Sequence, residues 1–357
     1  MMDVFSYHMP TRIVYGQDAI DHLDEHIRGR KALLVTSEGF VKRGLVDTIL
    51  SVTDRIVHVK SDVKSHPEFK DLTAACEELG AIDFDLIIAL GGGSVLDAAK
   101  FFAVQNPQGD CRFVEEMIRG ERPKEGYSLI PVISIPTTAG TGSEITPWAT
   151  IWDMDEKKKY SLHLPELFSE TALYDPKLTL SVPREITVQT GLDTLSHALE
   201  SIWNKNANPI TVGYATKAAK LIMENLVALS KDLENLQLRD NIMKACMYAG
   251  LAFSNTQTAI AHGMSYYITA HKNVPHGIAC SFTLPMLIDN VIGKYDFVDE
   301  ALTEIFGECS SRPLRELMHD LDVSTDFEDY GMDANELTAL KESLTNNPRA
   351  GNSLVTP

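Results

Sequence analysis

The stretch Leu86-Ile87-Ile88-Ala89-Leu90-Gly91-Gly92-Gly93-Ser94 decides the fold class of this 357-residue chain. Its apolar half predicts a strand buried on both faces, since a half-buried strand would alternate apolar and polar residues. The glycines predict a tight turn into a helix that begins at Val95. Such a turn either only connects strand to helix or holds a phosphate, because glycine lets the backbone approach an oxyanion and a helix start offers unpaired N–H groups. Three consecutive glycines favour the phosphate site, although the spacing is not the GxGxxG fingerprint.

Apolar runs of the same kind recur through the first half of the chain. Residues 31–36, 55–59 and 131–135 predict three more strands, because they are short and rich in β-branched residues. Residues 68–79 and 95–104 carry helical patterns between these strands. This alternation is typical of a parallel sheet flanked by helices.

In the second half the strand-like runs disappear and amphipathic helical patterns follow one another. Residues 314–321 place their leucines and a methionine on one helical face, and Asp333 followed by Glu336 resembles a helix N-cap box. Residues 346–357 are rich in turn formers, which predicts a surface segment. We therefore expect an α/β domain over residues 1–180 and an all-helical domain over residues 181–357.

The charge balance bears on the class of partner. Lys and Arg number 32 against 50 Asp and Glu, a formal net charge of −18, and this argues against binding nucleic acid or an anionic membrane surface. No run approaches the roughly 18 apolar residues of a membrane span, and no signal peptide is evident. The five cysteines are scattered and form no CxxC pair, as in reduced proteins, so the expected location is cytoplasmic.

A second loop strengthens the phosphate interpretation. The strand at 131–135 leads into Pro136-Thr137-Thr138-Ala139-Gly140-Thr141-Gly142-Ser143-Glu144, where small residues and four hydroxyls follow the strand's carboxyl end. Open α/β sheets bind their ligands at that end. A hydroxyl-rich surface loop is the alternative, but two such loops after two strands favour a dinucleotide as the ligand.

A possible metal site lies in the helical half. Asp193 and His197 are four residues apart, a spacing that places both side chains on one helix face. His262 and His276 follow, each just before a glycine. Each histidine alone is more often structural, yet three imidazoles and one carboxylate together suit Fe(II) or Zn(II) better than Mg or Ca. Such an ion polarises a carbonyl, and a nicotinamide can then deliver hydride to the carbonyl carbon.

These motifs together resemble the iron-containing (group III) alcohol dehydrogenases, over nearly the whole chain from about Pro10. The resemblance implies an N-terminal dinucleotide domain, a C-terminal helical domain with a cleft between the two, an architecture shared with dehydroquinate synthase, and usually a homodimer. It rests on Gly91-Gly92-Gly93-Ser94-x-x-Asp97-x-x-Lys100, on Pro136 to Glu144, on Gly191-Leu192-Asp193-x-Leu195-x-His197, and on Pro275-His276-Gly277.

The resemblance also implies roles for individual residues. The metal ligands would be Asp193, His197, His262 and His276. The cofactor would contact residues of both loops and a lysine near its ribose, namely Gly92, Gly93, Ser94, Thr137, Thr138, Thr141 and Lys159. Without the resemblance, the lysine run containing Lys159 would be interpreted as a solvated hairpin turn.

Two positions depart from the family pattern. Many members carry a second histidine four residues after the first C-terminal metal histidine, implicated in proton relay. Tyr266 stands at that position here, and His271 is a possible substitute. NAD-preferring members often carry Asp after the first strand, where this chain has Ser37, and Lys42 and Arg43 follow shortly. Ser37 removes a carboxylate that would repel a 2′-phosphate, so we expect NADPH to be accepted and NADH to remain usable.

Three stretches are most similar to the phosphonoacetaldehyde reductases of this family, residues 146–153, 203–209 and 275–285. This implies reduction of phosphonoacetaldehyde to 2-hydroxyethylphosphonate. Trp148, Phe253 and Thr258 align with the family's substrate pocket. Lys205 either binds the anion or caps the C-terminus of the metal helix, and His271 and Lys272 are the next candidates for the anion.

Other functions stay open at this point. The same family includes reductases of short aliphatic or hydroxylated aldehydes. A metal-dependent lyase resembling dehydroquinate synthase would use its NAD catalytically and would not consume NADPH stoichiometrically. A protein without catalytic activity is the weakest alternative, because both glycine loops and the four candidate ligands are intact.

Overall fold

The computed structural model describes residues 4–156, 158–345 and 347–355. These residues form two compact units. The α/β unit comprises residues 10–138 and 143–179, and the helical unit comprises residues 139–142, the residues from Leu180 onward and the described residues before Pro10. The two units cannot be separated by a single boundary in the sequence. The short segment 139–142 lies within the second glycine-rich loop, yet it belongs to the helical unit.

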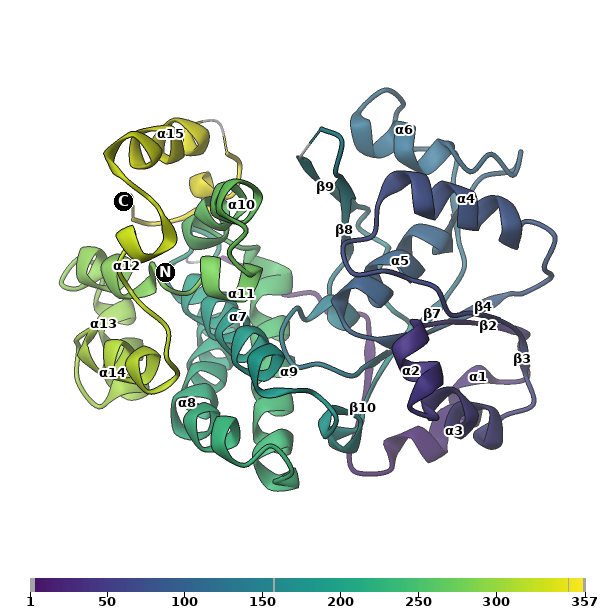
Figure 1. The fold of residues 1–357 in the computed structure, drawn as a ribbon, viewed down its shortest axis with the longest axis horizontal. Helices are drawn as coiled ribbons and strands as arrows, with labels where there is room; N and C mark the ends of the chain where they lie inside the picture. Colours follow the sequence, from purple (N-terminus) through teal and green to yellow (C-terminus); the bar gives the residue numbers. More distant parts are fainter. Residues whose placement is uncertain (1–3, 157, 346, 356–357) are drawn as a thin grey trace. The chain divides into compact units, whose positions relative to one another are not determined.

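The α/β unit is built on a six-stranded sheet in which all the strand pairs are parallel (Figure 1). All four predicted strands are confirmed to within a residue at their ends, and two more, each of four residues, escaped prediction because they are too short to show a period. The order across the sheet is β1 (Arg12–Tyr15), β10 (Thr171–Tyr174), β7 (Val132–Pro136), β4 (Leu86–Gly91), β2 (Ala32–Val35) and β3 (Ile56–Lys60).

Helices cover both faces of this sheet, as the continuous apolar strands predict. Alternate residues of β2 show the two faces: Leu33 belongs to the core formed with α4, α5 and α6, whereas Leu34 belongs to the core formed with α1 and α3. Figure 1 shows these two sets of helices on opposite sides of the strands. Their bounds are α1 (Leu23–Ile27), α2 (Glu38–Lys42), α3 (Leu45–Val52), α4 (Phe69–Leu79), α5 (Gly93–Ala103) and α6 (Phe113–Arg119).

Two antiparallel pairs complete the unit. The strands β5 (Val104–Gln105) and β6 (Ser128–Leu129) form a short pair, and β8 (Trp148–Asp153) and β9 (Lys158–His163) form a hairpin. The hairpin places Lys159 opposite Trp152. Prediction from the residues alone placed the lysine run in a hairpin turn, whereas Lys158 and Lys159 begin the second strand.

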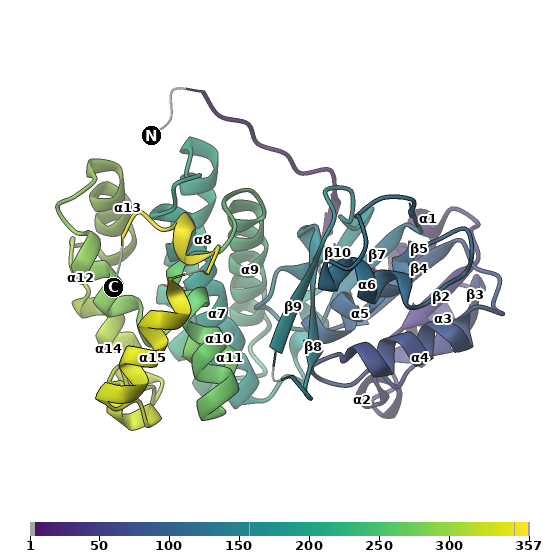
Figure 2. The same cartoon turned by 90° about the horizontal axis from the view of Figure 1, so that it is seen from above.

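The helical unit is arranged around α7 (Arg184–Ile202), which packs against α8, α9, α10 and α11 (Figure 2). Every residue of α7 from Gly191 to Ile202 is buried. The surrounding helices are α8 (Pro209–Lys231), α9 (Leu236–Thr256), α10 (Ile260–Lys272), α11 (His276–Ala279), α12 (Leu284–Val291), α13 (Asp296–Phe306), α14 (Arg312–Asp320) and α15 (Ala334–Leu344).

Sequence patterns in the last third are confirmed in part. The apolar stripe of α14 is buried, and the Asp333 side chain accepts hydrogen bonds from Asn335 N and Glu336 N, capping α15. The predicted surface tail is confirmed only in part: Pro348 and Gly351 are exposed, but Val355 lies in the core and Leu354 N donates to Trp203 O at 3.0 Å. Residues 346, 356 and 357 of that segment lie outside the described residues.

A buried lysine ties the first glycine loop's helix to the second glycine-rich loop. The Lys100 ammonium, at 0% exposure on α5, donates to the carbonyls of Ser143, Thr146 and Trp148. The Asp97 carboxylate accepts from Ser143 Oγ at 2.6 Å and from Thr150 N at 2.9 Å. Burial lowers the pKa of Lys100 to about 8, against the attraction of Asp97. Lys100 and Asp97 therefore fix the course of the second glycine-rich loop through buried hydrogen bonds.

The variant Lys100→Met should lower the free energy of unfolding by about 3–5 kcal/mol, because it leaves three carbonyls and the Asp97 carboxylate without their buried cation. Chemical denaturation measures this loss. Lys42→Met is the control, since Lys42 forms an exposed pair with Glu38 and its loss should cost about 0.5 kcal/mol. Equal losses in both variants would contradict the role of Lys100.

Candidate functional site

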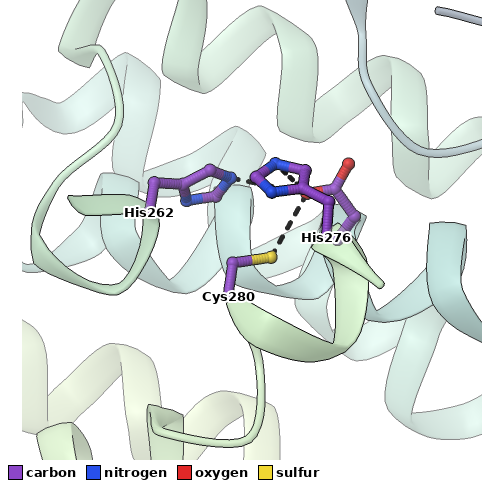
Figure 3. A group of neighbouring side chains, drawn as sticks. His262, His276 and Cys280 are labelled. Carbon is purple, nitrogen blue, oxygen red and sulfur yellow. Dashed lines mark hydrogen bonds and ion pairs between the residues drawn. The ribbon is translucent and has the colours of Figure 1, made fainter. Parts of the chain in front are cut away.

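An aspartate, two histidines and a cysteine converge in the helical unit. Asp193 comes from α7, His262 from α10, His276 from the first position of α11 and Cys280 from the position just after α11. Their candidate ligand atoms all lie within 4.8 Å of one another. The Asp193 Oδ1 atom is 3.4 Å from His262 Nε2 and 3.9 Å from His276 Nε2. Figure 3 shows His262, His276 and Cys280 pointing toward one another.

His197, the fourth predicted ligand, lies beside this group. Its Nδ1 atom is 3.9 Å from Asp193 Oδ1, and its ring stacks on His262 with the ring centroids 4.4 Å apart. The other face of the His197 ring stacks on Phe253 at 4.0 Å. Burial lowers the pKa of His197 to about 4, so its imidazole is neutral and keeps a free lone pair near pH 7.

A carboxylate that sequence reasoning missed holds His262 in place. The Glu200 side chain, buried at 0% exposure, lies 2.6 Å from His262 Nδ1 and accepts from Ala259 N and Ala261 N. A carboxylate on one ring nitrogen leaves the other, Nε2, turned toward a ligand. The signal was present in the sequence, because Asp193, His197 and Glu200 follow one helix face at intervals of four and three residues.

The position of His276 depends on a close approach of two helices. A Cβ atom added at Gly277 would lie 2.0 Å from the Gln189 carbonyl oxygen of α7, so only glycine allows α11 to lie this near. Gly277 therefore follows His276 because the packing of α11 on α7 leaves no room for a side chain at this position. Ser265 Oγ lies 3.3 Å from the second nitrogen of His276, Nδ1.

Two buried nitrogens test whether a metal ion fits this site. His197 Nδ1 and His262 Nε2 have no hydrogen-bond partner among the described residues. Buried polar atoms without partners are costly, and a bound ion would satisfy both. Burial by itself raises the pKa of the Asp193 carboxyl, but the surrounding histidines outweigh burial and hold that pKa below its usual range. An ionised carboxylate, the neutral imidazole of His197 and the unpartnered Nε2 atom of His262 fit a divalent ion such as Fe(II) or Zn(II).

Cys280 is an unpredicted member of the group. Its thiol is at 0% exposure and donates to Asp193 Oδ1 at 3.4 Å. Burial, reinforced by the charge of Asp193, raises the pKa of this thiol well above its usual value. In this protonated form Cys280 is a hydrogen-bond donor to the carboxylate. A lone cysteine gives no such signal in a sequence.

The two predicted proton-relay residues lie in different surroundings. The Tyr266 ring stacks beside His276, with the ring centroids 6.3 Å apart. The Arg349 guanidinium also contacts this ring, with its central carbon 4.6 Å from the ring centroid. His271 is exposed, packs on Tyr267, and its Nδ1 lies 2.9 Å from Tyr267 O. Within the described part of the chain, no contact joins His271 to the predicted metal ligands.

The two glycine-rich loops of the sheet approach each other at the carboxyl ends of β4 and β7. A Cβ atom at Gly92 would lie 3.2 Å from Thr138 Oγ1, and Thr137 N donates to Gly91 O at 3.0 Å. The Thr137 hydroxyl is buried without a hydrogen-bond partner among the described residues. A narrow glycine cradle with an unsatisfied hydroxyl fits the phosphates of a dinucleotide.

The other predicted cofactor residues lie in both units. Gly93 begins α5 next to Gly92, and Ser94 Oγ accepts from His66 N at 3.3 Å. The Lys159 ammonium lies 5.7 Å from the centre of the Trp152 ring. Ser37 precedes α2, directly after β2 and Thr36. Thr141 is exposed and belongs to the segment that groups with the helical unit.

The predicted substrate residues are likewise divided. Trp148 begins β8 in the α/β unit, with an edge contact to His163. Phe253 and Thr258 belong to the helical unit, where Thr258 O accepts from Asn352 Nδ2 at 3.0 Å. The exposed Lys205 ammonium donates to the carbonyl of Gly351 at 2.6 Å, so it neither caps its own helix nor stands free.

A parallel sheet with glycine- and hydroxyl-rich strand ends, in one chain with a helical unit that gathers an aspartate and histidines, is typical of dinucleotide-linked, metal-dependent oxidoreductases. Residues 10–176 match the model for iron-containing alcohol dehydrogenases, and residues 187–352 match the C-terminal model of the Fe-containing alcohol dehydrogenase family. The chain belongs to this family and is an oxidoreductase.

Relatives match most of the chain, and some match nearly all of it. A sulfoacetaldehyde reductase of Bilophila wadsworthia is 29% identical over 97% of this chain and 95% of its own. A 1-propanol dehydrogenase of Citrobacter freundii is 31% identical over 79% of this chain and 72% of its own. The structure of sulfoacetaldehyde reductase from Bifidobacterium kashiwanohense in complex with NAD+ superposes with a TM-score of 0.90, at 26% identity over 99% of this chain and 95% of that one. No helix in the described residues is long and apolar enough to cross a membrane.

The variants His262→Ala and His276→Ala should each lose bound metal, at least about tenfold per chain, because each removes a nitrogen that faces the Asp193 carboxylate. Metal content measured by mass spectrometry after loading with Fe(II) or Zn(II) checks this, and turnover should fall with it. The exposed His319→Ala is the control and should keep its metal. Full metal occupancy in His276→Ala would overturn this assignment.

Proposed function

We propose that this protein reduces a small aldehyde to an alcohol with NAD(P)H and a divalent metal ion, and that the aldehyde is phosphonoacetaldehyde, which yields 2-hydroxyethylphosphonate. The observation that carries the proposal is the group around Asp193, where two buried histidine nitrogens without partners face an ionised carboxylate. Its chemistry is that of a divalent ion site in a family of alcohol dehydrogenases.

Asp193, His197, His262 and His276 would hold the ion, Fe(II) or Zn(II). When bound, the ion supplies Lewis-acid polarisation of the carbonyl, which makes its carbon a better hydride acceptor. Glu200 fixes the ring of His262 through Nδ1, and Ser265 approaches Nδ1 of His276. These partners set which nitrogen each ring turns toward the site.

The alcohol oxygen must gain a proton after hydride transfer, and we propose that Tyr266 Oη delivers it. Stacking against His276 supports Tyr266 over His271, whose ring lies along its own helix at an exposed position. A tyrosine hydroxyl both donates and accepts a proton, so it can pass one on from water.

Gly92, Gly93, Ser94 and the threonines Thr137, Thr138 and Thr141 would hold the dinucleotide, with Lys159 near its ribose. The narrow approach of Gly92 to Thr138 and the unpartnered Thr137 hydroxyl support this placement. For cofactor choice, Ser37 offers no carboxylate against a 2′-phosphate, which favours acceptance of NADPH beside NADH.

The substrate proposal rests on two lines of support. Residues 146–153, 203–209 and 275–285 resemble the phosphonoacetaldehyde reductases, and two of the relatives that span almost the full chain are sulfoacetaldehyde reductases. Phosphonoacetaldehyde and sulfoacetaldehyde are both two-carbon aldehydes that end in a tetrahedral oxyanion. Trp148, Phe253 and Thr258 would contact the substrate.

An uncharged short aldehyde is the second candidate, because 1-propanol dehydrogenases are also relatives. The match of both parts of the chain to alcohol dehydrogenase models favours either aldehyde over a dehydroquinate synthase-like lyase reaction. The five cysteines form no disulfide, which fits a reducing compartment, and we propose a cytoplasmic homodimer. Analytical ultracentrifugation tests the dimer.

The deciding experiment follows NADPH and NADH oxidation by the Fe(II)- or Zn(II)-loaded protein with four aldehydes: phosphonoacetaldehyde, sulfoacetaldehyde, propanal and glycolaldehyde. The proposal expects the highest kcat/KM for phosphonoacetaldehyde, with stoichiometric cofactor oxidation and metal dependence. A higher kcat/KM for propanal would contradict phosphonoacetaldehyde as the substrate. The absence of cofactor oxidation with every aldehyde would overturn the proposal that the protein is an aldehyde reductase.

Ser37→Asp should shift the ratio of kcat/KM for NADH to that for NADPH at least about tenfold toward NADH. A carboxylate near the ribose accepts a hydrogen bond from the 2′-hydroxyl and repels a 2′-phosphate by about 1–4 kcal/mol near the surface. Ser51→Asp, on the exposed side of α3, adds the same charge elsewhere and should leave the ratio unchanged. An unchanged ratio in Ser37→Asp would remove Ser37 as the selector.

A further inference from the structure

Arg349 lies next to the predicted metal ligands, at a place that sequence analysis did not single out. Its guanidinium carbon is 4.6 Å from the centroid of the Tyr266 ring, and that ring is stacked beside His276. The Arg349 guanidinium is also attracted by the carboxylate of Glu200, which holds His262 in place. Tyr266 thus contacts both a fixed positive charge and a predicted ligand of the ion.

The guanidinium of Arg349 has donors to spare. Among the described residues, no side-chain or backbone oxygen accepts a hydrogen bond from it. Arg239, a buried arginine of the same unit, shows the usual arrangement, since its guanidinium donates to Leu233 O, Thr187 Oγ1 and Val182 O. An arginine offers five N–H donors in a planar fork, so Arg349 is equipped to bind an oxyanion with two of them.

The chain holds Arg349 in position through its backbone. Arg349 N donates to Asn347 Oδ1 at 3.0 Å, and the following turn is fixed by Asn352 Nδ2, which donates to Thr258 O at 3.0 Å. α15 and this turn both pack against α10, the helix that carries His262 and Tyr266. Little reorganisation is therefore needed when an anion binds.

The charge state of Arg349 suits the same role. Burial lowers the pKa of this arginine to about 10, against the attraction of Glu200, so the side chain stays protonated at neutral pH. Partial burial also strengthens its attraction for an anion relative to a lysine in open water. In a chain with a formal net charge of −18, an anionic substrate needs such a local cation.

The cations considered earlier are engaged elsewhere. The Lys205 ammonium is bound to the Gly351 carbonyl, and the Lys272 ammonium is paired with Glu336 at 2.7 Å. His271 is exposed with Nδ1 against a backbone carbonyl. Of these four residues, Arg349 alone combines unsatisfied donors with a place beside the predicted ligands.

We propose that Arg349 is the specificity-determining residue that binds the terminal oxyanion of the aldehyde, phosphonate or sulfonate, while the carbonyl end lies at the metal site. This rests on the proposed function of aldehyde reduction. Arg349 takes no part in bond making; it selects substrates in which an anionic group stands a short carbon chain away from the carbonyl. Arg349 and His276 both contact the Tyr266 ring, which supports a short span between the oxyanion and the carbonyl.

The test compares Arg349→Met and Arg349→Lys with the wild-type protein on phosphonoacetaldehyde, sulfoacetaldehyde and propanal. Methionine keeps an apolar contact with Tyr266 but removes the charge. We expect kcat/KM for an anionic aldehyde to fall about 10- to 100-fold in Arg349→Met, mostly through KM, as for a lost charged hydrogen bond. The propanal value should change less than about threefold, and Arg349→Lys should recover part of the loss. The two anionic aldehydes show which oxyanion the residue prefers.

The control is Arg312→Met, which removes an exposed arginine paired with Glu308 and should leave all three substrates unchanged. Metal content and melting temperature are measured for every variant. Equal losses on anionic and uncharged aldehydes, with metal retained, would overturn the proposal and leave Arg349 as a packing partner of Tyr266.

A binding measurement separates this inference from the proposed function. Ethylphosphonate and ethanesulfonate, which carry the oxyanion without the aldehyde, are titrated calorimetrically into the wild-type protein and Arg349→Met. Weaker binding of either anion to Arg349→Met supports the role of Arg349 even if no aldehyde is reduced. Unchanged binding of both overturns it, even if the protein proves to be an aldehyde reductase.

Discussion

The burial of the Asp193 carboxylate among imidazoles is the constraint to which the rest of the helical unit conforms. Removing a carboxylate and its partners from water costs several kcal/mol per ion, and good geometry with further hydrogen bonds must offset that cost. The surrounding contacts supply this geometry: His262 is fixed by Glu200, the Cys280 thiol donates to Asp193, and Gly277 brings His276 against α7. The packing of three helices thus follows from one buried charge.

The α/β unit also contains a buried charge, the Lys100 ammonium, which must be stabilised by hydrogen bonds. Lys100 and Asp97 are buried on α5, and their hydrogen bonds go to the loop that follows β7 and to the start of β8. The glycines form the narrow approach at Gly92, whereas the buried pair fixes the course of the second loop. Binding loops are usually mobile and variable, and a charged anchor beneath them preserves their shape.

The fold was predictable because its signals are local. Apolar runs identify β2, β4, β7 and the edge strand β3, and the helical periods identify α14 and the α15 cap. The metal site was predictable only in part. Asp193 and His197 share a helix face, which spacing reveals, but the union of His262 and His276 with them needed the family resemblance. Cys280 and Arg349 could not be found this way, since their roles depend on contacts between segments 87 and 83 residues apart in sequence. The strands β1 and β10 are too short to carry a period.

The complete burial of α7 from Gly191 to Ile202 has a consequence for how such enzymes diversify. A helix without an exposed side tolerates little change, since each substitution there disturbs a packed core. The turn that carries Arg349 is not part of α7, and it is held by hydrogen bonds from Arg349 N to Asn347 Oδ1 and from Asn352 Nδ2 to Thr258 O, just before α10. New substrate preferences can therefore arise in this turn while the chemistry encoded on α7 is inherited intact. An engineer who wishes to retarget the protein would randomise the turn and leave the helix alone.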